Sequence, residues 1–151
     1  MSIQEKINNG IKLSMKEKNA DKLAALRSVK SAILLELTKD GKTNISDEIA
    51  IQIISKLVKQ RKESALIFKS KNREDLEKEE LSQIKYLEVF LPKQLSEDEI
   101  KEKIKLKLNE IDNVSLKDMG RLMGLLMKEM SGKADGKIIS RVLKKQLSEK
   151  D

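Results

Sequence analysis

The sequence predicts an all-α protein, and two observations carry that prediction. Apolar residues recur at intervals of three and four along most of the chain, the spacing that lines one face of a helix. Helix-capping residues precede several of these stretches, and no stretch reads as strands joined by hairpin turns. We expect an N-terminal bundle of about four helices over residues 1–91, followed by a smaller C-terminal domain of about three helices over residues 92–151.

The first two helices are expected from apolar steps and from capping residues. The first has a four-residue step of apolar side chains: Ile3, Ile7, Ile11 and Met15. The second is expected over residues 20–39, with Asn19 as its N-cap and Gly41 just beyond its end. Its inward-facing side chains are predicted to be Leu23, Leu26, Ile33, Leu34 and Leu37.

The third and fourth helices begin at residues that suit a positive helix end. Ser46 opens the third, and Asp47 and Glu48 follow in its first turn. Its apolar stripe is predicted to be Ile49, Ile53, Leu57, Ala65 and Phe68, so the helix is expected to exceed about twenty residues. Asn72 is predicted to cap the fourth helix, which begins with an acidic stretch. Its packing residues are predicted to be Leu76, Ile84, Leu87 and Phe90.

Pro92, the only proline, cannot continue the fourth helix and is the predicted domain boundary. Ser96 and Glu99 form the capping-box pattern of the next helix, and Ser115 and Asp118 form a similar one. The first of these helices is expected to pack through Ile100, Ile104, Leu108 and Ile111. The second is expected to end near Gly132 and to pack through Met119, Leu122, Met123, Leu126, Met127 and Met130. Asp135 is predicted to cap the last helix, which packs through Ile138, Ile139, Val142, Leu143 and Leu147.

The composition excludes several kinds of chemistry. There is no cysteine, which excludes disulfides, zinc–thiolate sites and a thiol nucleophile, and there is no histidine, the commonest general base. We therefore predict no catalytic residue, metal site or cofactor. The start of the chain carries charges throughout, unlike a secretory signal, and no stretch has the apolar length of a membrane span. We expect an intracellular, cytoplasmic protein with no membrane partner.

Positive charge is concentrated in the last quarter of the chain. The net charge is +7, and residues 115–150 contain nine basic and four acidic residues, a net charge of +5. On the last helix, Lys137, Arg141 and Lys144 with Lys145 recur at the spacing of one helix face. Such a row can bind phosphates, but on spacing alone an ordinary solvated face is the stronger interpretation. The same alternatives hold for Arg121, Lys128 and Lys133.

Two glycines and a polar cluster leave further alternatives open. Gly120 and Gly124 lie four residues apart in one predicted helix, where each costs about 1 kcal/mol relative to alanine. They suggest close backbone approach by a neighbouring helix, which we favour, or by a nucleic-acid backbone. A polar cluster in the first half consists of Arg61, Arg73, Asp75 and Glu80. These residues could form a functional polar site. We favour the alternative, a structural role as inter-helix ion pairs or helix caps.

Several motifs in order resemble the YqeY-like family, whose members are related to the tail of the B subunit of the glutamine-dependent tRNA amidotransferase. The resemblance covers nearly the whole chain. The motifs in the first half are LRSVKSAI (26–33), VKQRKES (58–64), NREDLEKEE (72–80) and YLEVFLPKQLSEDE (86–99). Those in the second half are KDMGRLMGLLM (117–127) and GKADGKIISRVLKKQL (132–147).

The resemblance implies a function as well as two helical domains. In the amidotransferase the tail holds tRNA while the chemistry occurs in other domains, so the resemblance implies a tRNA-binding module. It places the tail motif toward tRNA: Gly120, Arg121, Gly124, Lys128, Lys133, Gly136, Lys137 and Arg141, to which we add Lys144. It also implies an association with carbon–nitrogen ligase activity using glutamine as amide donor, although the large domain that binds ATP and metal is missing. The alternatives are a subunit of such a ligase and a protein–protein adaptor that docks an amidotransferase or another translation protein. The tRNA species and the oligomeric state stay open.

Overall fold

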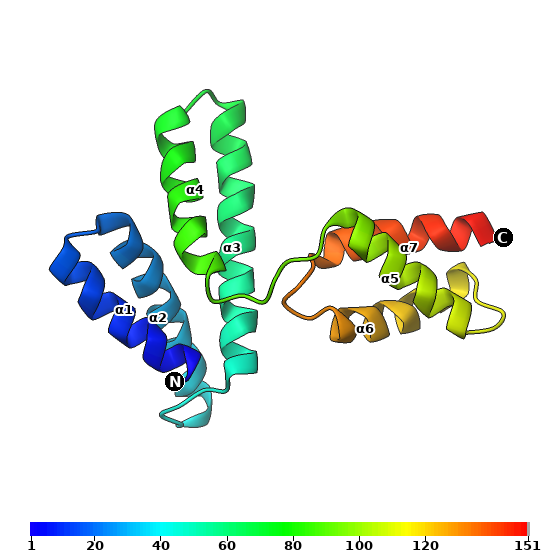
Figure 1. Cartoon of the computed structure of the whole chain (residues 1–151), viewed down its shortest axis with the longest axis horizontal. Helices are drawn as coiled ribbons and strands as arrows, with labels where there is room; N and C mark the ends of the chain where they lie inside the picture. Colours follow the sequence, from blue (N-terminus) through cyan, green and yellow to red (C-terminus); the bar gives the residue numbers. More distant parts are fainter. Residues whose placement is uncertain (151) are drawn as a thin grey trace. The chain divides into compact units, whose positions relative to one another are not determined.

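The computed structural model describes residues 1–150, and side chains through residue 149. Every regular element in this part of the chain is helical, which confirms the all-α prediction (Figure 1). The chain divides into two compact units, Met1–Leu91 and Pro92–Asp151, which are described separately.

The first unit contains four α-helices: α1 (Ile3–Glu17), α2 (Ala20–Asp40), α3 (Asp47–Ser70) and α4 (Glu74–Glu88). Two consecutive pairs, α1 with α2 and α3 with α4, run as helical hairpins (Figure 1). Helix α2 packs against all three of the others. Its buried side chains therefore lie at the centre of this core, where Ala25, Leu26 and Val29 are almost fully buried.

The predicted caps of α2 and α3 are confirmed, and one of them also joins two helices. The side-chain oxygens of Asn19 and Ser46 accept hydrogen bonds from the backbone amides of Lys22 and Ile49, at 3.2 Å each. The side-chain nitrogen of Asn19, Nδ2, also donates to the hydroxyl of Tyr86 on α4 at 3.1 Å. The turn between α1 and α2 is thereby attached to the end of α4.

Several predictions for the first unit are wrong by one helical position. Ser14, whose hydroxyl donates to the carbonyl of Gly10, is buried in place of Met15, which is 48% exposed. Leu34 is 52% exposed. The most buried residues of α3 are Ala50, Ile54 and Val58. Of the predicted stripe, Ala65 is buried, Ile53, Leu57 and Phe68 are partly buried, and Ile49 is exposed. The apolar residues of these helices occupy neighbouring positions, so packing against the other helices decides which of them face the core.

Asn72 does not cap α4, contrary to prediction. Its φ of 57° places it in the left-handed region, which Asn tolerates better than most residues, and the N-cap position is taken by Arg73. The guanidinium of Arg73 binds the carboxylate of Asp75, with Nη2–Oδ2 at 3.2 Å. This hydrogen bond is the main reason that the pKa of Asp75 lies below its ordinary value. This exposed pair is local to the start of α4, and is neither the expected inter-helix ion pair nor a side-chain cap.

Arg61 joins three helices of the first unit. Its guanidinium on α3 donates to Gln83 Oε1 of α4 at 3.0 Å, to Ser28 Oγ of α2 at 2.9 Å and to the carbonyl of Leu57 at 3.2 Å. Burial lowers the pKa of Arg61, and the nearby charge of Glu80 partly offsets this effect. The favoured structural role of this cluster is confirmed for Arg61.

The second unit contains α5 (Glu97–Glu110), the short 3₁₀ helix η1 (Leu116–Asp118), α6 (Met119–Glu129) and α7 (Gly136–Lys150). Helix α7 packs against both α5 and α6. The predicted capping boxes at Ser96 and Ser115 are both present, and the second opens η1 rather than α6. Asp135 Oδ1 accepts from the backbone amide of Lys137 at 3.0 Å, as expected of a cap.

The second core is built from aliphatic side chains and methionine. Its most buried members are Ile100, Ile104, Leu108, Leu122, Leu126, Met130, Ile139, Leu143 and Leu147. Met127, predicted to face inward, is 43% exposed. The buried side of each helix leaves its charged residues on the outer side, and these outer sides form the candidate site.

Candidate nucleic-acid interface

All six predicted RNA-binding side chains lie on the exposed surface of the second unit: Arg121, Lys128, Lys133, Lys137, Arg141 and Lys144. They come from α6, from the turn between α6 and α7, and from α7. Each helix turns its apolar residues into the shared core, which forces the intervening cations outward. Their side chains can therefore reach a ligand in solvent without rearrangement of the fold.

The two arginines of this set are held by carboxylates at the surface. Arg121 Nη2 lies 3.3 Å from Asp118 Oδ1, one turn earlier in the chain. Arg141 on α7 forms an ion pair with Glu97 on α5. The side chains of Arg121 and Arg141 remain 62% and 65% exposed, and exposed ion pairs contribute only about 0–1 kcal/mol. A phosphate can compete with such a carboxylate at little cost.

The lysines of the set differ in their surroundings. Within the described part of the chain, Lys128, Lys133 and Lys144 form no ion pair. The backbone of Lys133 is fixed, because its carbonyl accepts a hydrogen bond from the amide of Leu95 at 2.8 Å. This contact holds the turn that leads into α7 against the segment that precedes α5.

Gly120 and Gly124 do not pack against another helix, so the favoured interpretation of these residues is wrong. Both are exposed on α6, and a Cβ atom added at either would have no neighbour within 4 Å. The cations Arg121 and Lys128 share this exposed side with the two glycines. The result is a stretch of uncovered helix backbone flanked by positive charge. Gly136 differs, since an added Cβ would lie 3.1 Å from the Met127 side chain.

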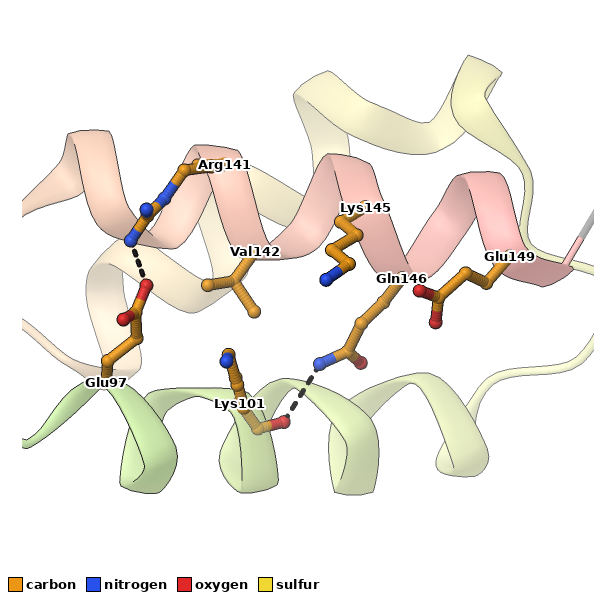
Figure 2. A pocket seen from close by; sticks show the side chains of 7 residues that line it. All are labelled: Glu97, Lys101, Arg141, Val142, Lys145, Gln146 and Glu149. Carbon is orange, nitrogen blue, oxygen red and sulfur yellow. Dashed lines mark hydrogen bonds and ion pairs between the residues drawn. The ribbon is translucent and has the colours of Figure 1, made fainter.

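Sequence reasoning missed a groove between α5 and α7. It has a volume of about 430 Å³ and is lined by Glu97 and Lys101 of α5 and by Arg141, Val142, Lys145, Gln146 and Glu149 of α7 (Figure 2). The side-chain amide of Gln146 donates to the backbone carbonyl of Lys101 at 3.0 Å. Three cations and two carboxylates surround this groove. Only the packing of α5 on α7 brings residues more than forty positions apart to one place.

The described residues offer no group of three or more acidic side chains that could hold a metal ion. Within the same residues, no helix is both long and apolar enough to cross a membrane.

Two comparisons with known proteins match most of the chain. The sequence model of a family described as "Yqey-like protein" matches residues 4–147, from α1 to α7. The chain is also similar to the protein named "Altered inheritance of mitochondria protein 41, mitochondrial" of Pyrenophora tritici-repentis (strain Pt-1C-BFP). The two are 26% identical over 144 residues, which cover 93% of this chain and 78% of that protein. The mitochondrial location in that name concerns the fungal protein.

Proposed function

The chain belongs to the Yqey-like family, and from this premise we propose that it is a tRNA-binding helical module. It acts as an accessory to tRNA-dependent amidation or to other tRNA metabolism and has no active site of its own. The proposal draws on the similarity of this family to the tail of the amidotransferase B subunit, which holds tRNA.

One observation carries the proposal: the six candidate cations are all exposed on the second unit. Neutralising RNA phosphates with such side chains releases counterions, which supplies affinity without reading the base sequence. The sequence has only one tyrosine and two phenylalanines, and no tryptophan, so stacking on unpaired bases contributes little. The ligand is therefore a folded RNA that is recognised by the shape of its backbone.

A binding titration with two RNA probes tests this proposal. Fluorescence anisotropy compares a labelled tRNA with an unstructured RNA of the same length, both added to the full chain at low salt. The proposal requires the tRNA to bind more tightly, because only a folded backbone presents phosphates in a fixed arrangement. Equal affinity for the two RNAs would reduce the function to general attraction between opposite charges, and an absence of binding would refute it.

A protein adaptor is the second candidate, and the first unit favours it. Large apolar side chains are exposed on α2 and α3, where Leu35 is 70% and Leu66 is 68% exposed. A separate groove of about 410 Å³ is lined by residues of α1 and α2, by the end of α4 and by the turn that follows it, among them Leu13, Val89 and Phe90. Apolar surface gathered in a groove is typical of protein interaction sites. A pull-down that retains a translation protein after nuclease treatment, and loses it in a Leu35→Ser, Leu66→Ser variant, would support the adaptor.

A further inference from the structure

The groove between α5 and α7 gathers positive charge from two helices. The side chain of Lys101 extends from α5 toward α7, and that of Lys145 extends from α7 toward α5 (Figure 2). Neither ammonium group forms an ion pair with any residue that the structure describes. Two like charges that face one groove repel each other, and an anion placed between them removes that repulsion.

The other groove residues suit a tetrahedral anion bound at the surface. The Nε2 atom of Gln146 uses one hydrogen in its bond to the Lys101 carbonyl, which orients the amide and leaves its second hydrogen to donate. Val142 is 4% exposed and supplies an apolar wall. At about 430 Å³ the groove accommodates a phosphate together with water.

Two carboxylates also line the groove, and they limit its charge. Glu97 is paired with Arg141 at one end, so these two largely cancel. Glu149 lines the groove as well, and with Lys101 and Lys145 it leaves one net positive charge. That balance fits one singly charged phosphodiester better than a cluster of phosphates.

We propose that the groove between α5 and α7 binds one phosphate of the RNA backbone, held by Lys101 and Lys145. This inference rests on the proposed tRNA function and extends it to α5, which carries none of the six predicted cations. Phosphate contacts of this kind fix the orientation of a protein on its nucleic acid. Within this site Lys101 and Lys145 bind the phosphate directly, and Gln146 supports them through its hydrogen bond to the backbone of α5.

The test compares two double variants that remove the same charge. Lys101→Gln with Lys145→Gln empties the groove of its free cations, whereas Lys103→Gln with Lys105→Gln removes two exposed lysines of α5 that do not line it. Each is titrated with labelled tRNA at several salt concentrations. In parallel, inorganic phosphate is added to ¹⁵N-labelled full chain, with sodium chloride at equal ionic strength as the reference.

The inference predicts that the groove variant binds tRNA about tenfold more weakly than the control variant. In a plot of log affinity against log salt, the slope for the groove variant should be less steep than that for the control variant by about one. Phosphate should shift the amide signals of Lys101 and Gln146 in the wild type and in the control variant, but not in the groove variant. Unchanged melting midpoints would show that both variants fold.

Two other results overturn the inference and separate it from the proposed function. If the wild type binds tRNA and both variants lose affinity equally, the groove holds no phosphate and the proposed function stands. If phosphate shifts the groove signals but the wild type binds no tRNA, the groove serves a free phosphorylated ligand. The proposed function then fails together with the inference drawn from it.

Discussion

The guanidinium of Arg141 on α7 forms an ion pair with the carboxylate of Glu97 on α5. The pair crosses the helix interface, yet both side chains are largely exposed, at 65% and 45%. The carboxylate of Glu97 is therefore already paired with Arg141, one of the six cations that the proposed function assigns to RNA. Binding through Arg141 requires a phosphate to replace this carboxylate.

Removing the charge of Glu97 should consequently tighten RNA binding. Since an exposed ion pair contributes at most about 1 kcal/mol, Glu97→Gln is expected to raise tRNA affinity up to about fivefold. The matched control is Glu102→Gln, which removes one negative charge from the exposed side of the same helix, outside the groove. Equal gains in the two variants, measured by anisotropy, would show that Arg141 makes no phosphate contact.

Alanine at Gly120 or Gly124 should have opposite effects on folding and on binding. Both glycines lie in α6 with open space around an added Cβ, so each substitution should raise the free energy of unfolding by about 0.5–1 kcal/mol. If an RNA backbone approaches this bare helix, the same methyl groups weaken tRNA binding. Urea denaturation and tRNA titration of the double variant measure the two effects.

Gly10 provides the contrast for this experiment. An added Cβ there would lie 2.7 Å from the Cδ1 atom of Leu26, where α1 meets α2. Gly10→Ala should therefore lower the free energy of unfolding. A stabilised Gly120→Ala, Gly124→Ala variant that binds tRNA as well as the wild type would mean that nothing approaches the bare side of α6.

Replacing Arg61 should destabilise the first unit even when the charge is kept. A lysine at this position cannot reproduce the separate hydrogen bonds to Gln83 and Ser28, and the partly buried partners lose their donor. Arg61→Lys is expected to cost about 1–3 kcal/mol in urea denaturation. Lys62→Gln breaks only the exposed pair with Glu88 and should cost less than about 1 kcal/mol. Similar costs for the two variants would contradict the role assigned to Arg61.

The capping box of α5 predicts a pH-dependent stability. The pKa of Glu99 is lowered, mainly because its carboxylate accepts a hydrogen bond from the backbone amide of Ser96. A lowered folded-state pKa means that Glu99 stabilises the fold above its ordinary pKa of 4.5, and that this contribution is lost as the pH falls through the folded-state value. Glu99→Gln should therefore melt at a lower temperature than the wild type at pH 7.

As the pH falls toward 3, the melting difference between Glu99→Gln and the wild type should become smaller, because more of the wild-type carboxylate becomes protonated. Glu102→Gln, on the same helix but outside the capping box, serves as the control. A difference that is the same at pH 7 and pH 3 would show that the charged form of Glu99 has no special role in the cap.

Local features of this fold could be predicted from sequence because neighbouring residues determine them. The caps at Asn19, Ser46 and Ser96 depend on contacts within three residues, and each was placed correctly. Burial was less predictable. Leu34 and Leu37 both suit a helix face, and only the packing of α2 among its three neighbours decides that Leu37 is buried and Leu34 is not.

The candidate site shows the same division. The exposure of Arg141 and Lys144 follows from their position opposite the apolar face of α7, so the sequence pattern was sufficient. The sequence alone does not predict that Lys101 and Lys145 line the same groove, because their proximity depends on how α5 packs against α7. The open surroundings of Gly120 were equally hidden, since spacing alone does not show whether another helix covers a glycine.

The salt dependence of tRNA affinity shows whether the exposed cations of the second unit bind RNA phosphates. Each neutralised phosphate contributes a slope of about −0.7 to −0.9 in a plot of log affinity against log salt. If even half of the six exposed cations contact phosphate, the slope is steeper than about −2. We expect tight binding to folded tRNA at about 50 mM salt that weakens with such a slope. A slope near zero, or no binding at low salt, would contradict it.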